Sequence, residues 1–116
     1  MHELQVTDRI LAIVLRYAAA HSVTKVLSIQ LKVGELSGLE DEWIQKYFDY
    51  QSKGTIAEGA KLNIERIPIV MECAGCGHSY EVKIREMKDM KCPECASMKA
   101  TLISGKDYSV VDMRAI

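Results

Sequence analysis

The sequence predicts an α+β fold, with two helices on a three-stranded sheet and a small four-cysteine module inserted before the last strand. Two stretches have helical spacing of apolar residues, three shorter stretches alternate apolar with polar, and all four cysteines fall between the second and third alternating stretch. The chain has 116 residues, of which 48% are hydrophobic and 27% charged. This composition is typical of a globular protein, and the length suffices for one small domain plus a smaller one that needs its own staple.

The first helix is predicted over residues 3–20, where apolar side chains recur at a spacing of three and four. We expect them to form one core-facing stripe with Ile10 beside it: Leu4, Leu11, Val14, Leu15 and Ala18.

A second helix is predicted from Glu40 to Gln51, with Gly54 as its stop signal. Its aromatic side chains Trp43, Tyr47 and Phe48 are expected either in the core or on a face that docks a partner.

Three strands are predicted from alternating patterns. The first covers residues 27–33, with Leu27, Ile29, Leu31 and Val33 on one face, and ends at Gly34. The second covers residues 61–66 and is bounded by Pro68, which cannot donate to a strand ladder. The third runs from residue 108 to 115. Because the cysteines lie between the second and third strands, their module is expected to be an insertion in one α+β domain.

The four cysteines form two C-x-x-C pairs, Cys73/Cys76 and Cys92/Cys95, with fifteen residues between the pairs. Each pair places two sulfurs on one side of an ion, so two such turns can complete the tetrahedral thiolate set that zinc prefers. We therefore predict a zinc-ribbon-like module with structural Zn(II). Two alternatives use the same residues: a pair of disulfides in a secreted protein, or iron in an electron-transfer site.

A site with four thiolates leaves no position for water or substrate, so the predicted zinc is structural. No Ser/His/Asp or Cys/His arrangement and no phosphate loop is present, and all the cysteines are committed to zinc, so we expect no enzyme. Residues 70–105 carry five Lys/Arg and five Asp/Glu. With Zn²⁺ and four thiolates their net charge is about −2, which argues against a nucleic-acid partner.

The remaining sequence signals favour a cytoplasmic protein. The longest apolar stretch, Ile10 to Ala20, is interrupted by Arg16 and is shorter than a membrane helix requires, so no membrane partner is expected. The first nine residues lack the basic cluster and apolar run of a secretory signal.

Several short motifs occur in an order that resembles the HypA family, the nickel-insertion proteins of [NiFe]-hydrogenase maturation. They are Met1-His2-Glu3-Leu4, then Val33-Gly34-Glu35-Leu36-Ser37-Gly38-Leu39-Glu40, then Gly54-Thr55-Ile56-Ala57-Glu58-Gly59-Ala60, the two C-x-x-C pairs, and Ser104-Gly105-Lys106-Asp107-Tyr108. Each motif alone is weak, but their order and spacing along the whole chain are specific.

The resemblance implies a nickel-binding domain formed by residues 1–69 and 106–116, with a zinc-binding domain at 70–105. It further implies a metallochaperone that accepts Ni(II) and delivers it, with a HypB-like GTPase, to the hydrogenase large-subunit precursor. Relatives in some organisms also serve urease, so urease accessory proteins are further possible partners. The sequence leaves open whether the chain is a monomer or a homodimer.

The chemistry of the first residues suits nickel. Because a bulky residue such as His2 generally prevents removal of the initiator methionine, Met1 is expected to keep a free α-amine. This amine, the deprotonated amide nitrogen of His2 and the His2 imidazole can close adjacent chelate rings around one ion. Nitrogen donors in a square-planar array favour Ni(II) or Cu(II) over zinc.

The fourth nickel donor is open at this point. The backbone nitrogen of Glu3, its carboxylate, water and a second imidazole are all candidates, and the Glu3 carboxylate equally fits a role at the helix N-terminus. His78, two residues after Cys76, is a possible second imidazole or an ordinary turn histidine. The competing hypothesis for the whole chain is a zinc-ribbon scaffold that binds protein or nucleic acid and has no nickel role.

Overall fold

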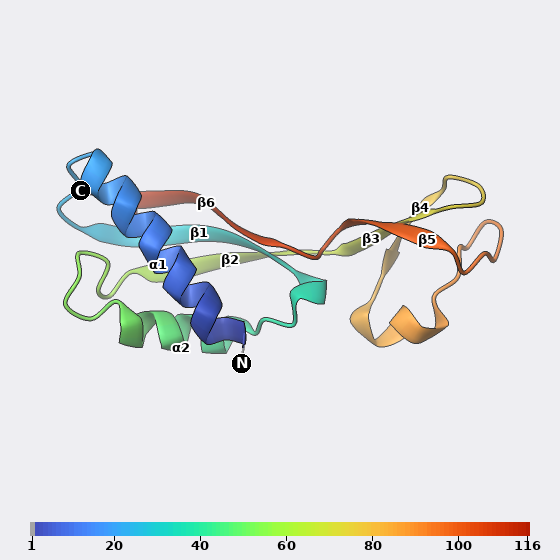
Figure 1. Ribbon diagram of the computed structural model, residues 1–116, viewed down its shortest axis with the longest axis horizontal. Coiled ribbons are helices and arrows are strands. Elements are labelled where there is room, and N and C mark those ends of the chain that lie inside the picture. Colours follow the sequence, from blue (N-terminus) through green and yellow to red (C-terminus); the bar gives the residue numbers. More distant parts are fainter. Residues whose placement is uncertain (1) are drawn as a thin grey trace. The chain divides into compact units, whose positions relative to one another are not determined.

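The computed structural model describes residues 2–116, except for the side chain of His2. Two longer helices and six strands follow one another along the chain, with two short 3₁₀ helices between them (Figure 1). They are α1 (His2–Ala20), β1 (Val26–Gly34), η1 (Glu35–Ser37), α2 (Asp41–Gln51), β2 (Lys61–Ile67), β3 (Ile69–Cys73), β4 (Ser79–Val82), η2 (Ile84–Asp89), β5 (Ala100–Ser104) and β6 (Tyr108–Ala115).

The chain divides into two compact units. Unit 1 consists of Met1–Lys32, Gly38–Glu65 and Ser109–Ile116, and unit 2 of Val33–Ser37 and Arg66–Tyr108. Each unit has a three-stranded sheet, in the order β2-β1-β6 for the first and β4-β3-β5 for the second. The predicted α+β class, with two helices and a three-stranded sheet, is confirmed.

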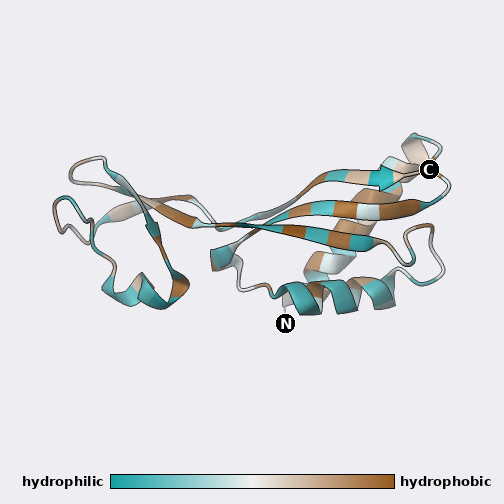
Figure 2. Cartoon of the chain, turned by 180° about the vertical axis from the view of Figure 1, so that it is seen from behind, coloured by the Kyte–Doolittle hydropathy of each residue, from teal (hydrophilic) through white to brown (hydrophobic). Residues whose placement is uncertain are grey.

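In unit 1, α1 lies across one face of the β2-β1-β6 sheet and α2 packs beside α1 (Figures 1 and 2). The two helices are joined by a hydrogen bond that the Thr7 hydroxyl donates to the side-chain oxygen of Gln51 at 2.6 Å. Between the helices and the sheet lies an apolar core, and its buried members include Ile10, Val14, Ala18, Val26, Ile29, Leu31, Ile44 and Phe48.

The buried face of α1 differs from the predicted stripe. Leu4 is 44% exposed and Leu15 is only half-buried, whereas Ile10 is fully buried and Thr7 is buried beside it. The actual stripe is therefore rotated toward the 7–10–14–18 row, because the packing of α1 on α2 decides which of two overlapping apolar rows faces inward.

A similar shift occurs at the start of β1. The predicted inward residue Leu27 is 43% exposed, and Val26 is buried instead, while Ile29 and Leu31 are buried as predicted. The burial pattern therefore breaks its alternation between Val26 and Ile29.

Unit 2 has a much smaller core. Its central strand β3 pairs antiparallel with β4 and with β5, so that Met71 lies opposite Tyr80 on one side and Leu102 on the other. Ile69, Met71 and Val82 form the buried cluster, against which Leu36, Tyr80, Met87, Met90, Ala100 and Leu102 pack while partly exposed. Pro68 separates β2 from β3, as the sequence predicts.

Two glycines explain why two separated sequence motifs meet in unit 2. The backbone of Gly34 packs so closely on that of Gly105 that a Cβ at position 34 would overlap the Gly105 carbonyl group. The Gly34 N–H donates to the carbonyl of Asp107 at 2.8 Å, and the Leu36 N–H donates to that of Gly105 at 2.8 Å. Only residues without a side chain permit this approach.

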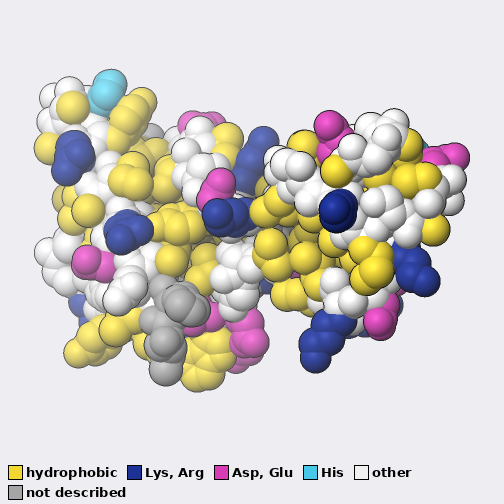
Figure 3. Space-filling view, turned by 45° about the vertical axis from the view of Figure 1, so that its right-hand side comes forward, with side chains coloured by type: hydrophobic (Ala, Val, Ile, Leu, Met, Phe, Trp, Pro, Cys, Tyr) yellow, Lys and Arg dark blue, Asp and Glu magenta, His cyan; other side chains and the backbone are white. Residues whose placement is uncertain are grey.

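Among residues 2–116, no helix is long and apolar enough to cross a bilayer. Along the strands, hydrophobic and hydrophilic residues alternate (Figure 2). On the face drawn in Figure 3, basic and acidic side chains are interspersed.

Candidate metal centres

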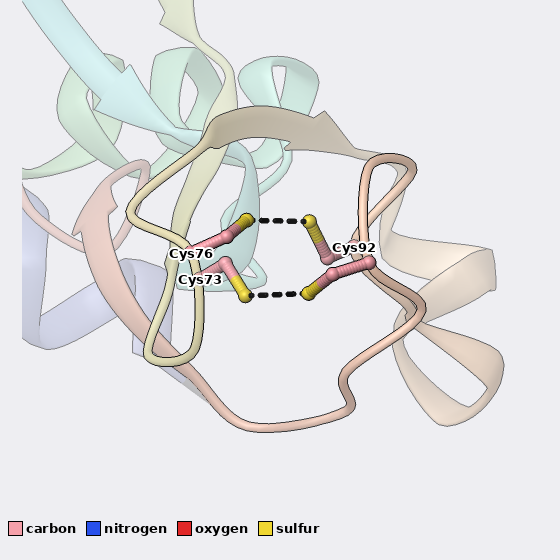
Figure 4. Close-up of side chains that lie close together, drawn as sticks. Cys73, Cys76 and Cys92 are labelled. Atoms are coloured by element: carbon pink, nitrogen blue, oxygen red, sulfur yellow. Dashed lines mark hydrogen bonds between the residues drawn. The ribbon is translucent and has the colours of Figure 1, made fainter.

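The structure brings the four cysteines of unit 2 together at one point (Figure 4). Their sulfurs all lie within 4.8 Å of one another, with 3.4 Å between Cys73 and Cys95 and 3.5 Å between Cys76 and Cys92. A disulfide would need about 2.05 Å. Four sulfurs around one Zn²⁺ at about 2.3 Å would lie about 3.8 Å apart. The spacing is therefore that of free thiols arranged for a tetrahedral ion.

The first C-x-x-C turn is built by backbone hydrogen bonds at the end of β3. The Cys73 N–H donates to the carbonyl of His78 at 2.9 Å, and the Gly77 N–H donates back to the carbonyl of Cys73 at 3.0 Å. In addition, the Gly75 N–H donates to Sγ of Cys73 at 3.3 Å. Gly77 has a φ of +78°, which closes the turn.

The second turn repeats this pattern with different side chains. The Cys92 N–H donates to the carbonyl of Ser97 at 2.9 Å, and the Ala96 N–H donates to the carbonyl of Cys92 at 2.8 Å. The Glu94 N–H donates to Sγ of Cys92 at 3.4 Å. Ala96 has a φ of +62°, a left-handed conformation that costs about 1–2 kcal/mol for a residue with a Cβ.

The thiols differ in acidity because each ionised sulfur acts on its neighbours. Backbone N–H donors, chiefly that of Cys76, lower the pKa of Cys73 to about 6. At Cys76 the N–H of His78 favours the thiolate, but the neighbouring sulfurs and burial outweigh it and raise the pKa to about 12. The pKa of Cys95 is also raised, because the neighbouring Cys73 sulfur and burial outweigh the Ser97 N–H, which favours its thiolate. Four thiolates therefore coexist here only when a cation compensates their charge.

This donor set fits zinc. Four soft sulfur donors in a tetrahedral arrangement suit Zn²⁺, and the same donors also accept iron. The sequence did not predict that backbone N–H groups donate to the sulfurs or that Tyr80 lies near them. Burial and the nearby sulfurs raise the pKa of Tyr80, so its hydroxyl stays neutral beside the thiolates.

At the other end of the chain, the proposed α-amine of Met1 and the imidazole of His2 lie outside the described residues. The described part begins with the helix itself, since α1 starts at His2. Glu3 is half-buried, and its carboxylate oxygen accepts a hydrogen bond from the backbone N–H of Glu40 at 3.2 Å. Glu40 is the N-cap residue of α2, so the Glu3 side chain stabilises the start of the neighbouring helix.

The two other histidines occupy different surroundings. His78 belongs to unit 2, is half-buried, and stacks on Tyr80 with ring centroids 6.4 Å apart. His21 is exposed after the end of α1, where its Nδ1 lies 2.9 Å from the carbonyl oxygen of Tyr17 and its ring stacks on that residue.

Comparisons with known proteins extend over the whole chain. Residues 1–115 match the family model described as "Hydrogenase/urease nickel incorporation, metallochaperone, hypA". A hydrogenase maturation factor HypA from Nitrosospira multiformis is 32% identical over 116 residues, which cover 100% of this chain and 98% of that protein. The HypA of Syntrophus aciditrophicus is 37% identical, over 92% of this chain and 91% of the relative.

Two solved structures have the same fold. The solution structure of the Ni metallochaperone HypA from Helicobacter pylori superposes with a TM-score of 0.68 at 17% identity, covering 98% of this chain and 97% of the other. A second solution structure of a HypA protein gives a TM-score of 0.74 at 19% identity, with 100% and 97% covered. Together with the match of residues 1–115 to the family model, the sequence relatives establish that this chain belongs to the HypA family of nickel-incorporation metallochaperones.

Proposed function

We propose that this chain carries Ni(II) at its N-terminus and delivers it, together with a HypB-like GTPase, to the large-subunit precursor of a [NiFe]-hydrogenase in the cytoplasm. The nickel donors are the α-amine of Met1, the amide nitrogen and imidazole of His2, and the backbone nitrogen of Glu3. The nickel-binding domain comprises residues 1–69 and 106–116, and the zinc-binding domain residues 70–105. Nickel is cargo, so the chain needs no catalytic residue.

The observation that carries this proposal is the place of Glu3 in the helix. Its carboxylate is engaged by the Glu40 N–H at 3.2 Å, which leaves the backbone nitrogen as the donor that needs no rearrangement of the side chain. The first N–H groups of any helix have no carbonyl partner within the helix. The amides of His2 and Glu3 therefore can be deprotonated and bound to metal without breaking a helical hydrogen bond.

Delivery also constrains the affinity. A dissociation constant near one micromolar corresponds to about −8 kcal/mol, whereas a picomolar site at about −16 kcal/mol would release its metal very slowly. Because the amine, the amides and the imidazole all compete with protons, nickel binding strengthens as the pH rises. A micromolar-class site permits transfer to a partner by ligand exchange.

Structural zinc is proposed for the other centre, held by Cys73, Cys76, Cys92 and Cys95. The ion supplies positive charge that allows four thiolates to lie within 4.8 Å of one another. The chain's own contribution is to orient the sulfurs through the backbone N–H groups of Gly75 and Glu94. The imidazole of His78 is the alternative to the Glu3 backbone nitrogen as nickel donor, and the His78→Ala variant tests it.

The test is a calorimetric titration of Ni(II) into the zinc-loaded chain that starts at Met1. One site of micromolar affinity is expected, and both His2→Ala and a version with residues added before Met1 should abolish it. Glu3→Gln keeps the backbone nitrogen and alters only the carboxylate, so it should bind nickel with nearly unchanged affinity.

His21→Ala is the matched control, since it removes an exposed imidazole after the end of α1 and leaves the first turn of that helix intact. His78→Ala tests the other imidazole considered as a nickel donor. Unchanged nickel binding in the His2 and extended variants would contradict the N-terminal site. Loss of binding in His78→Ala would make that residue a ligand. A native chain that binds no nickel would favour the alternative, a zinc-ribbon scaffold for protein or nucleic acid.

A further inference from the structure

One glutamine side chain attaches the first turn of α1 to α2. Gln51, the last residue of α2, is half-buried, and both polar atoms of its side chain contact α1. Its side-chain nitrogen donates to the carbonyl of Leu4 at 3.2 Å, and its side-chain oxygen lies 2.6 Å from the hydroxyl oxygen of Thr7. Leu4 and Thr7 are about one helical turn apart, so Gln51 holds α1 at two successive levels.

The directions of these hydrogen bonds follow from the donors available. A backbone carbonyl only accepts, so the amide nitrogen of Gln51 must face Leu4 and its oxygen must face Thr7. The single proton of the Thr7 hydroxyl has two acceptors in reach, the Gln51 oxygen at 2.6 Å and the Leu4 carbonyl at 3.0 Å. Because the Leu4 carbonyl already accepts from Gln51, the hydroxyl donates to Gln51. Thr7 is 0% exposed, so this end of the contact is shielded from water.

A second contact holds the residue just before Leu4. The Glu3 carboxylate accepts a hydrogen bond from the backbone N–H of Glu40, immediately before α2. The start of α1 is therefore attached at Glu3 to the N-terminal end of α2, and at Leu4 and Thr7 to its C-terminal end. Residues 1–3, which we propose to hold nickel, directly precede the contacts with Gln51.

Nickel bound to residues 1–3 acts on this same turn. The N–H groups of His2 and Glu3 have no carbonyl partner in the helix, but the carbonyls of these two residues accept the N–H groups of residues 6 and 7. A planar chelate through successive backbone nitrogens imposes backbone angles that differ from those of an α-helix. Metal binding therefore weakens the bonds to residues 6 and 7, and a first turn without other support would fray.

We propose that Gln51 is a positioning residue for the nickel site. It holds the Leu4 carbonyl and the Thr7 hydroxyl, and it thereby confines the nickel-linked change of backbone conformation to the turn before Asp8. This inference rests on the proposed N-terminal nickel site. The remainder of α1 keeps its place on α2 with or without nickel, so the donors adjust to the metal and release it without a change in the fold of unit 1.

NMR of the zinc-loaded full chain, with and without equimolar Ni(II), tests the proposal, because square-planar Ni(II) is diamagnetic. In the native chain, nickel should shift the amide signals of Glu3 and Leu4 and leave those of residues 8–11 unchanged. In Gln51→Ala, nickel should shift residues 8–11 as well. It should also speed hydrogen exchange of the Asp8 amide, the helical partner of the Leu4 carbonyl, by roughly tenfold.

Two further variants separate this role from a loss of stability. Gln51→Ala leaves the Thr7 hydroxyl free to donate to Leu4, 3.0 Å away, so no buried donor loses its partner and the variant should fold. Gln51→Glu keeps the length of the side chain and accepts from Thr7, but it donates nothing to Leu4, so it should respond to nickel like Gln51→Ala. Gln45→Ala is the matched control. Gln45 lies on the same helix but bonds to the β2 edge, so its loss should leave the nickel response unchanged.

The outcomes distinguish this inference from the nickel site on which it rests. A native chain in which Glu3 and Leu4 do not respond to nickel would refute the N-terminal site and, with it, the role of Gln51. Signals of Glu3 and Leu4 that respond equally in all variants, with residues 8–11 unchanged throughout, would refute the role of Gln51 alone. So would a response of residues 8–11 in the native chain, or an equal spread of the response in Gln45→Ala.

Discussion

The two units of this chain bury apolar surface to very different extents. Unit 1 encloses a continuous core between two helices and a sheet, with Phe48, Ile10 and Ile44 fully buried. The main buried cluster of unit 2 has three side chains, Ile69, Met71 and Val82, and its other fully enclosed groups include the sulfur ligands Cys73 and Cys92. A segment with so small a core needs a staple. Unit 1 therefore owes its fold to burial, and unit 2 depends on the metal that we propose for its four cysteines.

Removal of the metal should produce the largest difference in stability between the two units. Cys92→Ser, or a strong chelator, removes a metal contribution of about 10–16 kcal/mol and should unfold unit 2. NMR spectra should then lose the dispersed amide signals of residues 66–108 and retain those of α1 and α2. Simultaneous unfolding of both units would show that the core of unit 1 does not suffice by itself.

Phe48→Ala is the corresponding test of unit 1, because it removes a buried side chain from the core of that unit and leaves the four cysteines unchanged. Phe48 is 0% exposed in the core of unit 1, and truncation of a buried phenylalanine costs about 3–5 kcal/mol. Urea unfolding followed by helical circular dichroism should measure this loss, while the zinc content stays at one per chain. Tyr50→Ala on the same helix is the control, because Tyr50 is 71% exposed and its loss should be nearly neutral. Zinc loss in Phe48→Ala would contradict the separation of the two stabilising mechanisms.

The acidity of the thiols predicts how metal binding depends on pH. At pH 7–8 the pKa of about 6 leaves Cys73 ionised, whereas the raised pKa values of Cys76 and Cys95 keep both protonated. Zinc binding at pH 7–8 should therefore release at least two protons, those of Cys76 and Cys95. Below about pH 6, where Cys73 is also protonated, it should release one proton more. Competition with a chromophoric chelator should show the logarithm of the apparent affinity rising with pH, more steeply below pH 6.

The same pKa values determine how pH shifts the folding equilibrium of metal-free unit 2, which lies toward the unfolded state. A pKa lowered from 9.0 to about 6 means that the Cys73 thiolate adds stability fully above pH 9, and that this stability is lost as the pH falls toward 6. The raised pKa of Cys76 has the opposite sign, so its contribution is present below pH 9 and is lost as the pH rises toward 12. Proton release independent of pH between 5 and 8 would contradict the assigned protonation states.

The smallest predicted effects compare the two cysteine turns. Gly77 and Ala96 occupy equivalent left-handed positions, with φ of +78° and +62°, and a Cβ at Gly77 would meet nothing within 4 Å. Ala96→Gly should relieve strain and stabilise the zinc-bound unit by about 0.5 kcal/mol, whereas Gly77→Ala should cost about 1 kcal/mol. Thermal unfolding of the zinc-loaded chain measures both, and equal signs would contradict the equivalence of the turns.

Local sequence signals predict the elements better than their contacts. The helices, the strands of unit 1 and the break at Pro68 follow from periodicity and from the missing N–H of proline. The C-x-x-C spacing likewise brings the four sulfurs together. The inward row of α1 could not be predicted, because Leu4 and Ile10 both fit a helical stripe and only the packing of α2 distinguishes them.

Contacts between residues far apart in the sequence also could not be predicted from local sequence patterns. An acidic residue such as Glu3 is common in the first turn of a helix, so its position alone predicts only a role in α1. Nothing in the sequence indicates that its carboxylate accepts a hydrogen bond from the backbone N–H of Glu40, the N-cap residue of α2. The β5 and β4 strands around the cysteines have short, weakly alternating sequences, so the second sheet was not predicted. The glycine pair Gly34 and Gly105 is visible in two motifs, but its reason is a backbone approach in the folded chain.

X-ray absorption spectroscopy at the nickel and zinc edges of the doubly loaded chain tests the central claim most directly, namely that each unit holds its own metal with its own donors. We predict a nickel shell of nitrogen and oxygen donors without sulfur, and a zinc shell of four sulfurs at about 2.3 Å. Sulfur in the nickel shell, or nitrogen replacing sulfur at zinc, would contradict the assignment of nickel to the N-terminus and of zinc to the four cysteines.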